Sequence, residues 1–461
     1  MTGITRQLAD YVAHVAQDDI PASVVEAAKL LVLDLLGNAL AGAGVESSRV
    51  VRETVLELAA GGEASIVATD RRVPSPFAAL LNGLYAHTLD FDDTFGAGSI
   101  HPGAVVIPAV IALAEERRSS GRAVLAAVIA GYEVTCRLAS AVDPKRHYAR
   151  GFHPTATLGA FGTSAGAASL LGMSGEDVAN LFGIALSHAS GTLRFLTSAA
   201  WTKRLHAGVA GYNGLFATRL AERGFVGAEE AIEGASGLLA AYTDTPHPEA
   251  VLADLGKAYR ILDVDVKPFP AGRYSHAPLE AVLRILSENA LRPDEIEAID
   301  IGVSEVGLKN MALPADRKRR PSTFVEAQFS IPFQIAVAVR LGRFGLDGYT
   351  LVGDKAVEEM ADRIVVRVDP EAERAYPERW IASVEVRAGG RTYAIRGHES
   401  ISRPTWDSVP PKFMGLAVPV VGSDGAQRIV EIVRHLGEAA NVMDLAASLR
   451  GSLASTPAVL R

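Results

Sequence analysis

Acidic and histidine side chains gather in one short segment of the sequence. Asp90, Asp92 and Asp93 end an otherwise apolar run that also contains His87, and His101 follows after a glycine-rich stretch. Carboxylates this close together raise one another's pKa, so burying them requires compensating partners. Two interpretations follow: a solvated turn that caps the next helix, or a functional site.

Two further segments carry side chains that suit proton transfer and anion binding. His153 comes directly before an uncharged run of small residues. A histidine in such a place is able to have one ring nitrogen fixed and the other free, which suits a general acid or base. Lys203, Arg204 and His206 lie together at an expected helix start. The alternative for each is a structural histidine or a solvated surface cation.

A fourth segment contains a lysine that the sequence holds in place. Lys267 stands beside Pro-Phe-Pro, with Tyr274 and His276 close behind. The chain has no HExxH, CxxC or Glu-rich di-metal spacing and no glycine-rich nucleotide-binding motif, so we expect neither a metal nor an organic cofactor. The remaining Asp, His and Lys residues suit proton abstraction beside a carboxylate, with lysines neutralising the substrate's charge.

Composition narrows the class of protein. Of 461 residues, 49% are hydrophobic and 21% charged, which is typical of a globular protein with a large core. A formal charge of −8 and the lack of a long basic run argue against a nucleic-acid partner. One cysteine, Cys136, and an N-terminus without a signal-like segment predict a cytoplasmic protein. The uncharged run 154–175 is predicted to be a buried helix, so no membrane partner is expected.

Hydrophobic spacing predicts a helical first half. Residues 1–258 place apolar side chains at helical intervals. Ser23 with Glu26, and Ser174 with Asp177, are predicted to cap two of these helices. An α-helical body rich in Ala and Gly is therefore expected.

Residues 259–404 are predicted to form a smaller α+β domain. YRILDVDVK, IEAIDIGVSE, RIVVRVD and WIASVEVRAGGRTYAI alternate apolar and polar residues as strands do, and the last forms a hairpin across Gly389 and Gly390. APLEAVLRILSEN and TFVEAQFSIPFQIAVAVRLG are predicted helices, which gives a two-layer domain with a mostly antiparallel sheet. Residues 405–461 return to helix and are expected to pack on residues 1–258, so the α+β lid is an insertion in a discontinuous helical domain.

The motifs HxxDFDDT, HPG, RGFHPT, TKRLHAG, VKPFP and EAQFSIPFQIAVAV follow one another along the chain, and in this order the sequence resembles the MmgE/PrpD family. The resemblance implies a large helical domain with a smaller α+β lid, a homodimer, and action on a small di- or tricarboxylate without a cofactor. It implies a pocket between the domains. The expected catalytic residues are Asp90, His101, His153, Lys203 and Lys267, and the expected substrate-binding residues are Thr94, Asp93, Arg204 and His276.

These features predict a lyase or isomerase that abstracts a proton beside a carboxylate. Dehydration of a 2-methylcitrate-like hydroxy acid leads, with an iminodisuccinate-like epimerase and a cis-aconitate-type decarboxylase as alternatives. A terpene cyclase would match the DxDD pattern of the aspartates but needs a cavity lined with aromatics, and only 6% of the residues are aromatic. A helical scaffold without activity would leave the charged clusters without a common pocket.

Overall fold

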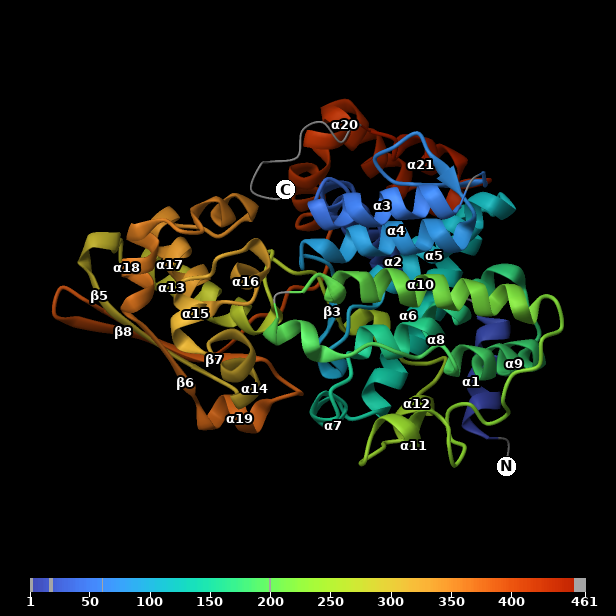
Figure 1. The fold of residues 1–461 in the computed structure, drawn as a ribbon, viewed down its shortest axis with the longest axis horizontal. Helices are drawn as coiled ribbons and strands as arrows, with labels where there is room; N and C mark the ends of the chain where they lie inside the picture. The colour runs from blue at the N-terminus through green and yellow to red at the C-terminus, as the bar shows by residue number, and fades with distance from the viewer. Residues whose placement is uncertain (1–2, 16–19, 60, 199, 452–461) are drawn as a thin grey trace.

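The computed structural model describes residues 3–15, 20–59, 61–198 and 200–451. It has a large helical part and, beside it, a smaller part in which helices lie against a sheet (Figure 1). The predicted fold class, mainly α-helical with a smaller α+β part, is confirmed. The last ten residues of the predicted helical domain, 452–461, lie outside the described residues.

The helical part is built from the first half of the chain and from its end. Its longer helices are α1 (Ile4–His14), α2 (Ala22–Gly42), α3 (Glu46–Leu58), α4 (Ser75–Thr88), α5 (Pro102–Arg117), α6 (Gly121–Ala141), α8 (Pro154–Leu171), α9 (Gly175–Leu186), α10 (Thr202–Ala221) and α20 (Val409–Arg434). Shorter helices are α7 (Pro144–Ala149), α11 (Leu238–Tyr242), α12 (Glu249–Leu252) and α21 (Met443–Ser448). One hydrophobic core runs from α1 to residues after α21, so the two ends of the chain share it.

Small residues allow α6 and α8 to pack closely. A Cβ added at Gly162 would lie 1.7 Å from Thr135 Oγ1, and one added at Gly131 would lie 2.9 Å from the carbonyl oxygen of Gly162. α8 is the uncharged run that the sequence predicted to be buried, and it is buried from Pro154 to Ser169. Among the described residues only α6 is long and apolar enough to cross a membrane, and it is mostly buried inside the protein.

One of the two predicted helix caps is present. Ser174 Oγ accepts a hydrogen bond from the Asp177 N–H at 3.2 Å at the start of α9. The cap predicted at Ser23 was wrong, because α2 begins one residue earlier, after Pro21, and has no side-chain cap. Pro21 already holds the φ angle near the value that a helix start requires.

The smaller part contains a four-stranded sheet in the order β6-β5-β7-β8. Its strands are β5 (Ile296–Val303), β6 (Ile364–Val368), β7 (Ile381–Ala388) and β8 (Arg391–Glu399). Only the β5–β6 pair is parallel, so the sheet is mostly antiparallel as predicted. Gly389 and Gly390 have φ angles of 55° and 70°, which are the left-handed values that a two-residue hairpin needs.

Helices cover this sheet, and the remaining predicted strand, YRILDVDVK, is present only as two residues. α13 (His276–Glu288) and α17 (Ile331–Leu341) share a core with the sheet, and the shorter helices are α14 (Glu305–Met311), α15 (Ala315–Arg319), α16 (Phe324–Gln328), α18 (Lys355–Asp362) and α19 (Pro370–Ala375). YRILDVDVK forms a 3-10 turn followed by the two-residue β4 (Val264–Asp265). The reason is tertiary, because the Ile261 N–H donates to the buried Glu133 carboxylate instead of to a neighbouring strand.

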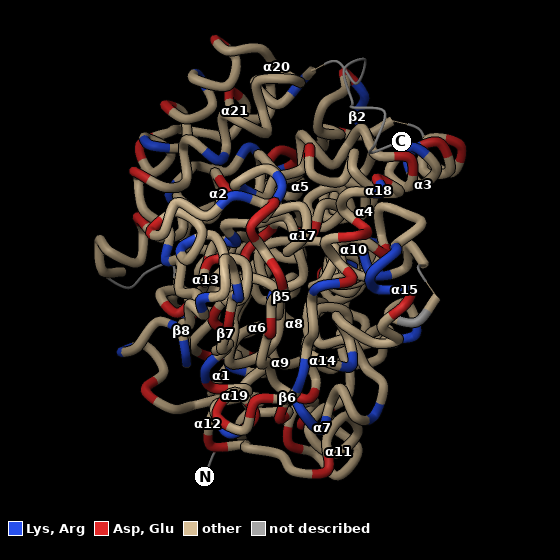
Figure 2. Tube along the Cα trace, turned by 90° about the vertical axis from the view of Figure 1, so that its left-hand side faces the viewer, with Lys and Arg blue, Asp and Glu red and all other residues tan. Residues whose placement is uncertain are grey.

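Two connections join the helical part and the α+β part near the aspartate-rich turn. β4 pairs with β3 (Thr94–Phe95), which lies directly after the aspartate-rich turn. After the sheet, the chain returns through α20, which packs on α2, where a Cβ at Gly37 would lie 3.0 Å from Phe413 Cδ2. Figure 2 shows acidic and basic positions interspersed along the trace of both parts.

Candidate active site

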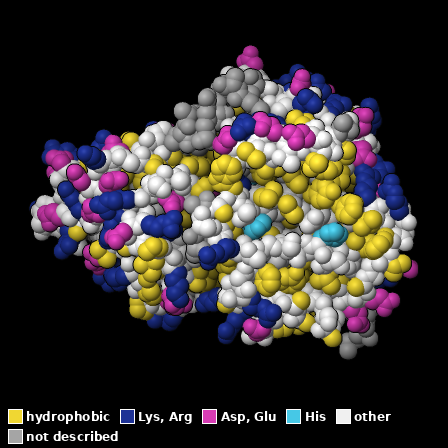
Figure 3. Space-filling view, viewed as in Figure 1, with side chains coloured by type: hydrophobic (Ala, Val, Ile, Leu, Met, Phe, Trp, Pro, Cys, Tyr) yellow, Lys and Arg dark blue, Asp and Glu magenta, His cyan; other side chains and the backbone are white. Residues whose placement is uncertain are grey.

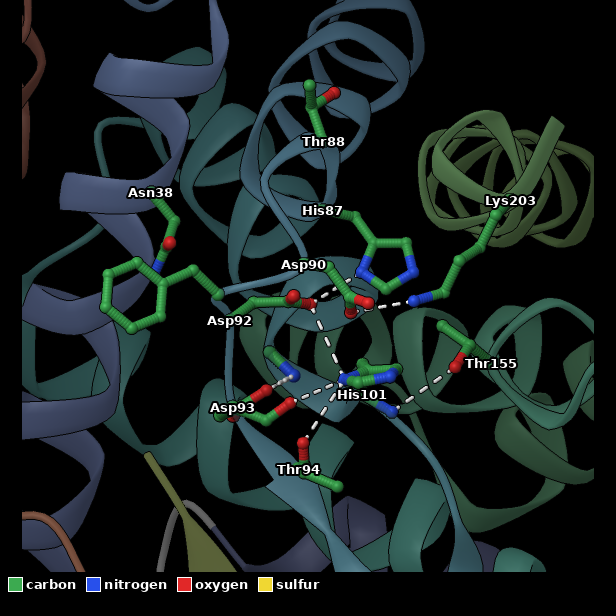
Figure 4. A network of polar contacts seen from close by, with 12 residues as sticks. Asn38, His87, Thr88, Asp90, Asp92, Asp93, Thr94, His101, Thr155 and Lys203 are labelled. Carbon is green, nitrogen blue, oxygen red and sulfur yellow. Dashed lines mark hydrogen bonds and ion pairs between the residues drawn. The ribbon is translucent and has the colours of Figure 1, made fainter. Parts of the chain in front are cut away.

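A sharp turn after α4 separates the three aspartates. Asp90 has a φ angle of +52°, a left-handed value that residues other than glycine rarely adopt. Figure 4 shows that the carboxylates of Asp90, Asp92 and Asp93 consequently point to different partners. All three side chains are buried, so the solvated-turn interpretation is wrong.

Asp90 binds two lysines from distant parts of the chain. Lys203 Nζ lies 2.7 Å from Asp90 Oδ1, and Lys267 Nζ lies 2.6 Å from the same oxygen. Burial alone would raise the pKa of Asp90, but the two ammonium groups hold it well below its usual value. With both lysines charged, the cluster keeps a net positive charge that suits an anionic substrate.

His101 is the N-cap residue of α5 and has a defined tautomer. Its Nδ1 lies 2.8 Å from the carbonyl oxygen of Asp93 and 3.4 Å from Thr94 Oγ1. A carbonyl oxygen only accepts, so Nδ1 carries the proton and Nε2 keeps its lone pair. Burial and the Lys267 charge hold the His101 pKa well below its usual value, so the ring is neutral at neutral pH. His101 is therefore arranged as a base.

His153 is the N-cap residue of α8 and contacts a second histidine. Its Nδ1 lies 3.1 Å from Nδ1 of His206, which belongs to α10. Burial, followed by the neighbouring His206, holds the His153 pKa well below its usual value. Because Nδ1 is engaged by His206, Nε2 is the nitrogen left for the cavity that His153 lines.

Asp92 and Asp93 hold the surrounding frame. Asp92 Oδ2 accepts from His87 Nδ1 at 2.7 Å, and Asp93 accepts from the Tyr132 hydroxyl at 2.6 Å and from the Gly103 N–H at 3.0 Å. Burial would raise the pKa of Asp92, but His87 keeps it below its usual value. Burial raises the pKa of Asp93 to about 7. These two aspartates have different protonation behaviour although they are neighbours in the sequence.

Three helices begin at the cavity. His101 and His153 cap α5 and α8, and Lys203 is the second residue of α10. The first N–H groups of a helix lack intrahelical partners and, with the helix dipole, favour a nearby negative charge. The arrangement suits a substrate that carries carboxylates.

The cavity lies between the helical part and the α+β part, and residues of both line it. Five predicted site residues line it, namely Asp90, Thr94, His101, His153 and Lys203. Its other walls are formed by Ser99, Tyr148, Leu193, Phe195, Leu196, Gly272, Arg273, Tyr274, Asn310, Met311, Phe329 and Trp380. Residues from Gly272 onward in this set come from the α+β part, so both parts are needed to close the site.

Two predicted site residues, Lys267 and Asp93, lie behind the cavity wall. Lys267 is buried and also donates to the Asp90 carbonyl oxygen at 2.9 Å, so it holds Asp90 and is not among the residues that line the cavity. Asp93 is occupied by Tyr132 and the backbone of α5. The geometry gives both residues a supporting place in this structure.

The other two, Arg204 and His276, are also held away from the cavity. Arg204 donates to Ser47 Oγ at 2.9 Å and to Gln328 Oε1 at 3.2 Å, which ties α10 to the α+β part. His276 is fully buried at the start of α13, with Nε2 3.1 Å from the Ala271 carbonyl oxygen. Arg204 is therefore engaged by the protein, and His276 is fixed through Nε2 while its Nδ1 is buried without a hydrogen-bond partner among the described residues.

Arg273 is the charged wall residue that the sequence analysis did not select. Its Nη2 lies 3.0 Å from Asp265 Oδ2 and 2.5 Å from the Ser400 carbonyl oxygen. It is a cation that lines the cavity from the α+β part, where the Asp265 carboxylate already pairs with it. The available signal was its position in the segment between Lys267 and His276, both of which had been selected.

Aromatic wall residues come from separated parts of the chain and share no sequence motif. The Tyr274 ring is tilted by 37° against the Trp380 ring with centroids 4.6 Å apart, and its hydroxyl lies 3.1 Å from that of Tyr376. Phe195 packs against the edge of His153 at 5.3 Å. Phe195, Tyr274 and Trp380 form an aromatic part of the cavity wall, and sequence spacing alone gave no sign of them.

One group of side chains has the composition of a metal site. Among the described residues, His87, Asp92 and His101 place their ligand atoms within 4.8 Å of one another. Both Nδ1 atoms hold protons for hydrogen bonds, that of His87 to Asp92 and that of His101 to the backbone. A nitrogen that donates has no lone pair for a metal, so the two Nδ1 atoms, which are the ring nitrogens near Asp92 Oδ2, belong to a hydrogen-bond network here.

The protein has two parts with a cavity between them. Two neutral histidines, His101 and His153, line this cavity together with Asp90, whose carboxylate is paired with two lysines. These features are those expected of the family that the motifs resemble. Residues 6–250 match the MmgE/PrpD N-terminal domain and residues 269–438 match the MmgE/PrpD C-terminal domain. The chain therefore belongs to the MmgE/PrpD family, which confirms the resemblance of its motifs.

Several relatives carry names that indicate an activity. A cis-aconitate decarboxylase-like protein, oryM, of Aspergillus oryzae is 28% identical, with 98% of each chain covered. The cis-aconitate decarboxylase of Mus musculus is 30% identical over 68% of this chain and 66% of its own, and that of Homo sapiens is 24% identical over 98% and 95%. The family and these relatives make the chain a lyase-type enzyme at the coarse level.

Proposed function

We propose that the protein is a lyase that acts on a small di- or tricarboxylate and whose chemical step is proton transfer at a carbon near a carboxylate. The observation that carries this proposal is the cavity in which His101 and His153, both neutral, face the cluster of Asp90 with Lys203. Neutral imidazoles exchange protons near neutral pH, and the cationic cluster offsets the charge of the substrate.

Decarboxylation of a cis-aconitate-type acid is the first reaction that we propose. The names of the relatives support it. In this reaction a C–C bond breaks, carbon dioxide leaves, its electron pair moves into the unsaturated carbon chain, and one carbon takes up a proton. His153 delivers that proton, while Lys203 and Arg273 hold the carboxylates that remain.

Dehydration of a hydroxy acid, which the sequence favoured, is the second candidate. The tautomer of His101 supports it, because Nδ1 donates to the backbone and leaves Nε2 as a base. His101 would remove the proton beside the carboxylate, and His153 would protonate the departing hydroxyl. The two reactions differ in their proton balance, since dehydration releases only water and decarboxylation takes up one proton.

The test is incubation with cis-aconitate, 2-methylcitrate, citrate and iminodisuccinate in deuterated water, followed by NMR. Release of carbon dioxide with one deuterium in the product supports decarboxylation. Loss of water without carbon dioxide supports dehydration, and deuterium exchange in a dicarboxylate with inverted configuration supports the epimerase alternative. If none of the acids reacts and none raises the thermal stability of the protein, the proposal is wrong.

A homodimer is a separate proposal that rests on the family resemblance. Figure 3 shows apolar side chains gathered on the face on which α3 and α10 lie. Val50 of α3, Phe216 of α10 and nearby Trp201 are exposed. Apolar patches of this kind often mark interfaces. Analytical ultracentrifugation tests the proposal, and a monomer at micromolar concentration contradicts it.

A further inference from the structure

The contact between His153 and His206 links the cavity to a more exposed side chain. His153 is 2% exposed and lines the cavity, whereas His206 is only partly buried and is absent from the cavity wall. Their Nδ1 atoms lie 3.1 Å apart. The second nitrogen of each ring is on the side away from this contact.

A hydrogen bond between two imidazole nitrogens needs one donor and one acceptor. One proton therefore lies between the two Nδ1 atoms, and it is covalently bound to Nδ1 of either ring. When a ring gains a proton at one nitrogen, it becomes able to release the proton at the other. Two rings joined through Nδ1 consequently form a path from Nε2 of one to Nε2 of the other.

We propose that His206 is a relay that supplies solvent protons to His153. Water protonates His206 at Nε2, the shared proton moves from His206 Nδ1 to His153 Nδ1, and His153 gives its Nε2 proton to the substrate carbon. One proton enters and one leaves, so both rings end neutral. Each ring then has the opposite tautomer from the one in which it began. The starting tautomers return when each ring releases the proton at one nitrogen and binds a proton at the other. The relay rests on the proposed decarboxylation, which consumes one proton in each turnover.

The surroundings of His206 disfavour its protonated, positively charged form, so the ring does not retain an extra proton. The Phe195 ring lies 5.8 Å from the His206 ring, and the charged or titratable groups that act on His206 are His87, Lys203 and His153. Burial, then His87 and Lys203, lowers the pKa of His206 to about 4. The pair is therefore neutral at neutral pH, and a proton that enters it is passed on.

The activity test compares His206→Gln with wild type on the acid that the NMR screen identifies. Glutamine still forms a hydrogen bond to His153 but does not carry a proton through its side chain. We expect kcat to fall about tenfold or more with KM unchanged, and free imidazole in the buffer to restore kcat. His188→Gln, at a partly exposed histidine away from the cavity wall, is the matched control and should keep wild-type kcat.

Two outcomes of this experiment overturn the relay. One is wild-type kcat in His206→Gln, and the other is a loss of kcat that imidazole does not restore, which indicates that His206 only positions His153. If no acid reacts with the wild-type protein, the proposed function fails, but the relay still has its own test.

That test is nitrogen NMR of the histidine-labelled protein without substrate. A shared proton gives partly protonated Nδ1 signals for both His153 and His206, and His206→Gln should change the tautomer of His153. A proton that resides entirely on one Nδ1 in the wild type, together with an unchanged His153 tautomer in His206→Gln, overturns the relay whether or not a substrate is known.

Discussion

Lys267 is joined to Asp90 at two points, the carboxylate oxygen at 2.6 Å and the backbone carbonyl oxygen at 2.9 Å. The first contact neutralises the side chain and the second fixes a residue whose φ angle is +52°. The lysine follows β4, so the chain that leads into the α+β part holds the turn that carries the site.

Replacing Lys267 by methionine should therefore lower stability as well as activity. The change leaves the buried Asp90 with one lysine, and hydrogen bonds to charged groups contribute about 1.5 to 3 kcal/mol. We expect a loss of this size in the free energy of unfolding measured with urea. Lys355→Met, at an exposed lysine in α18, is the control and should stay within about 0.5 kcal/mol of wild type. Equal stability of the two variants contradicts the supporting place of Lys267.

Lys203 and Arg273 should bind substrate from the two sides of the cavity. Either Lys203→Met or Arg273→Met removes a charge-assisted contact, so we expect KM to rise about tenfold or more. kcat should fall as well if closure around the substrate positions the base. Steady-state kinetics of both variants measure this, and unchanged KM in both would remove the two-sided clamp.

His101→Gln should remove a base while keeping a hydrogen-bonding side chain. We expect turnover to fall by about a hundredfold or more, the size typical of losing a general acid or base. The melting temperature should change little, since the N-cap position tolerates a polar residue. Near-normal turnover would exclude His101 from the proton-transfer step.

Asp93 should make the stability of the protein depend on pH. Its pKa is raised to about 7 in the folded state, so the folded protein binds this proton more tightly than the unfolded chain does. The resulting stabilisation is fully present below the ordinary value of 3.8 and is lost as the pH rises through about 7. The lowered pKa values of Asp90 and Asp92 act in the opposite direction, and both groups remain in Asp93→Asn.

Urea unfolding of wild type and Asp93→Asn between pH 5 and pH 8 isolates that contribution. The stability of the wild type relative to the variant should decrease as the pH rises. A difference that stays constant over this range would show that Asp93 titrates at an ordinary pKa.

Activity should survive exhaustive dialysis against a chelator. Nδ1 of His87 and Nδ1 of His101 lie 2.7 and 3.8 Å from Asp92 Oδ2, and both donate hydrogen bonds, so neither of these two nitrogens is free to bind a metal in this arrangement. The measurement is turnover before and after dialysis, with Mg²⁺, Fe²⁺ and Zn²⁺ added back. Activity that disappears and returns with one of these ions would contradict the prediction.

The sequence predicted the elements that local patterns determine. The hairpin about Gly389 and Gly390 follows from two adjacent glycines, and the buried α8 follows from its small residues. It placed the aspartates at the end of a helix, but it did not predict the left-handed φ of Asp90 or its pairing with two lysines from distant parts of the chain. It also took the segment around Ile261 for a strand, because the partner of its N–H, Glu133, is far away in the sequence.

The sequence identified which residue types form the site, but it did not show which of these side chains reach the cavity. The motifs selected Lys267 and Arg204 as cations, but which of them reaches the cavity depends on packing between parts. Lys267 pairs with Asp90 and Arg204 donates to Gln328, whereas Arg273 lines the cavity. His206 was noted with the lysine cluster, but only the close approach of α8 and α10 reveals its contact with His153.

The position of α20 has a consequence for how the protein is made. Lys412 in this helix donates to the Phe91 carbonyl oxygen in the aspartate-rich turn and pairs with Asp34 of α2 at 2.7 Å. A ribosome must therefore translate the whole α+β part before the first half of the chain receives the helix that completes its core. Until then the nascent chain exposes the surface of α2 that Phe413 will cover. A gene shortened before residue 409 would lose a support of the turn, so it would yield an incomplete fold and not merely a shorter tail.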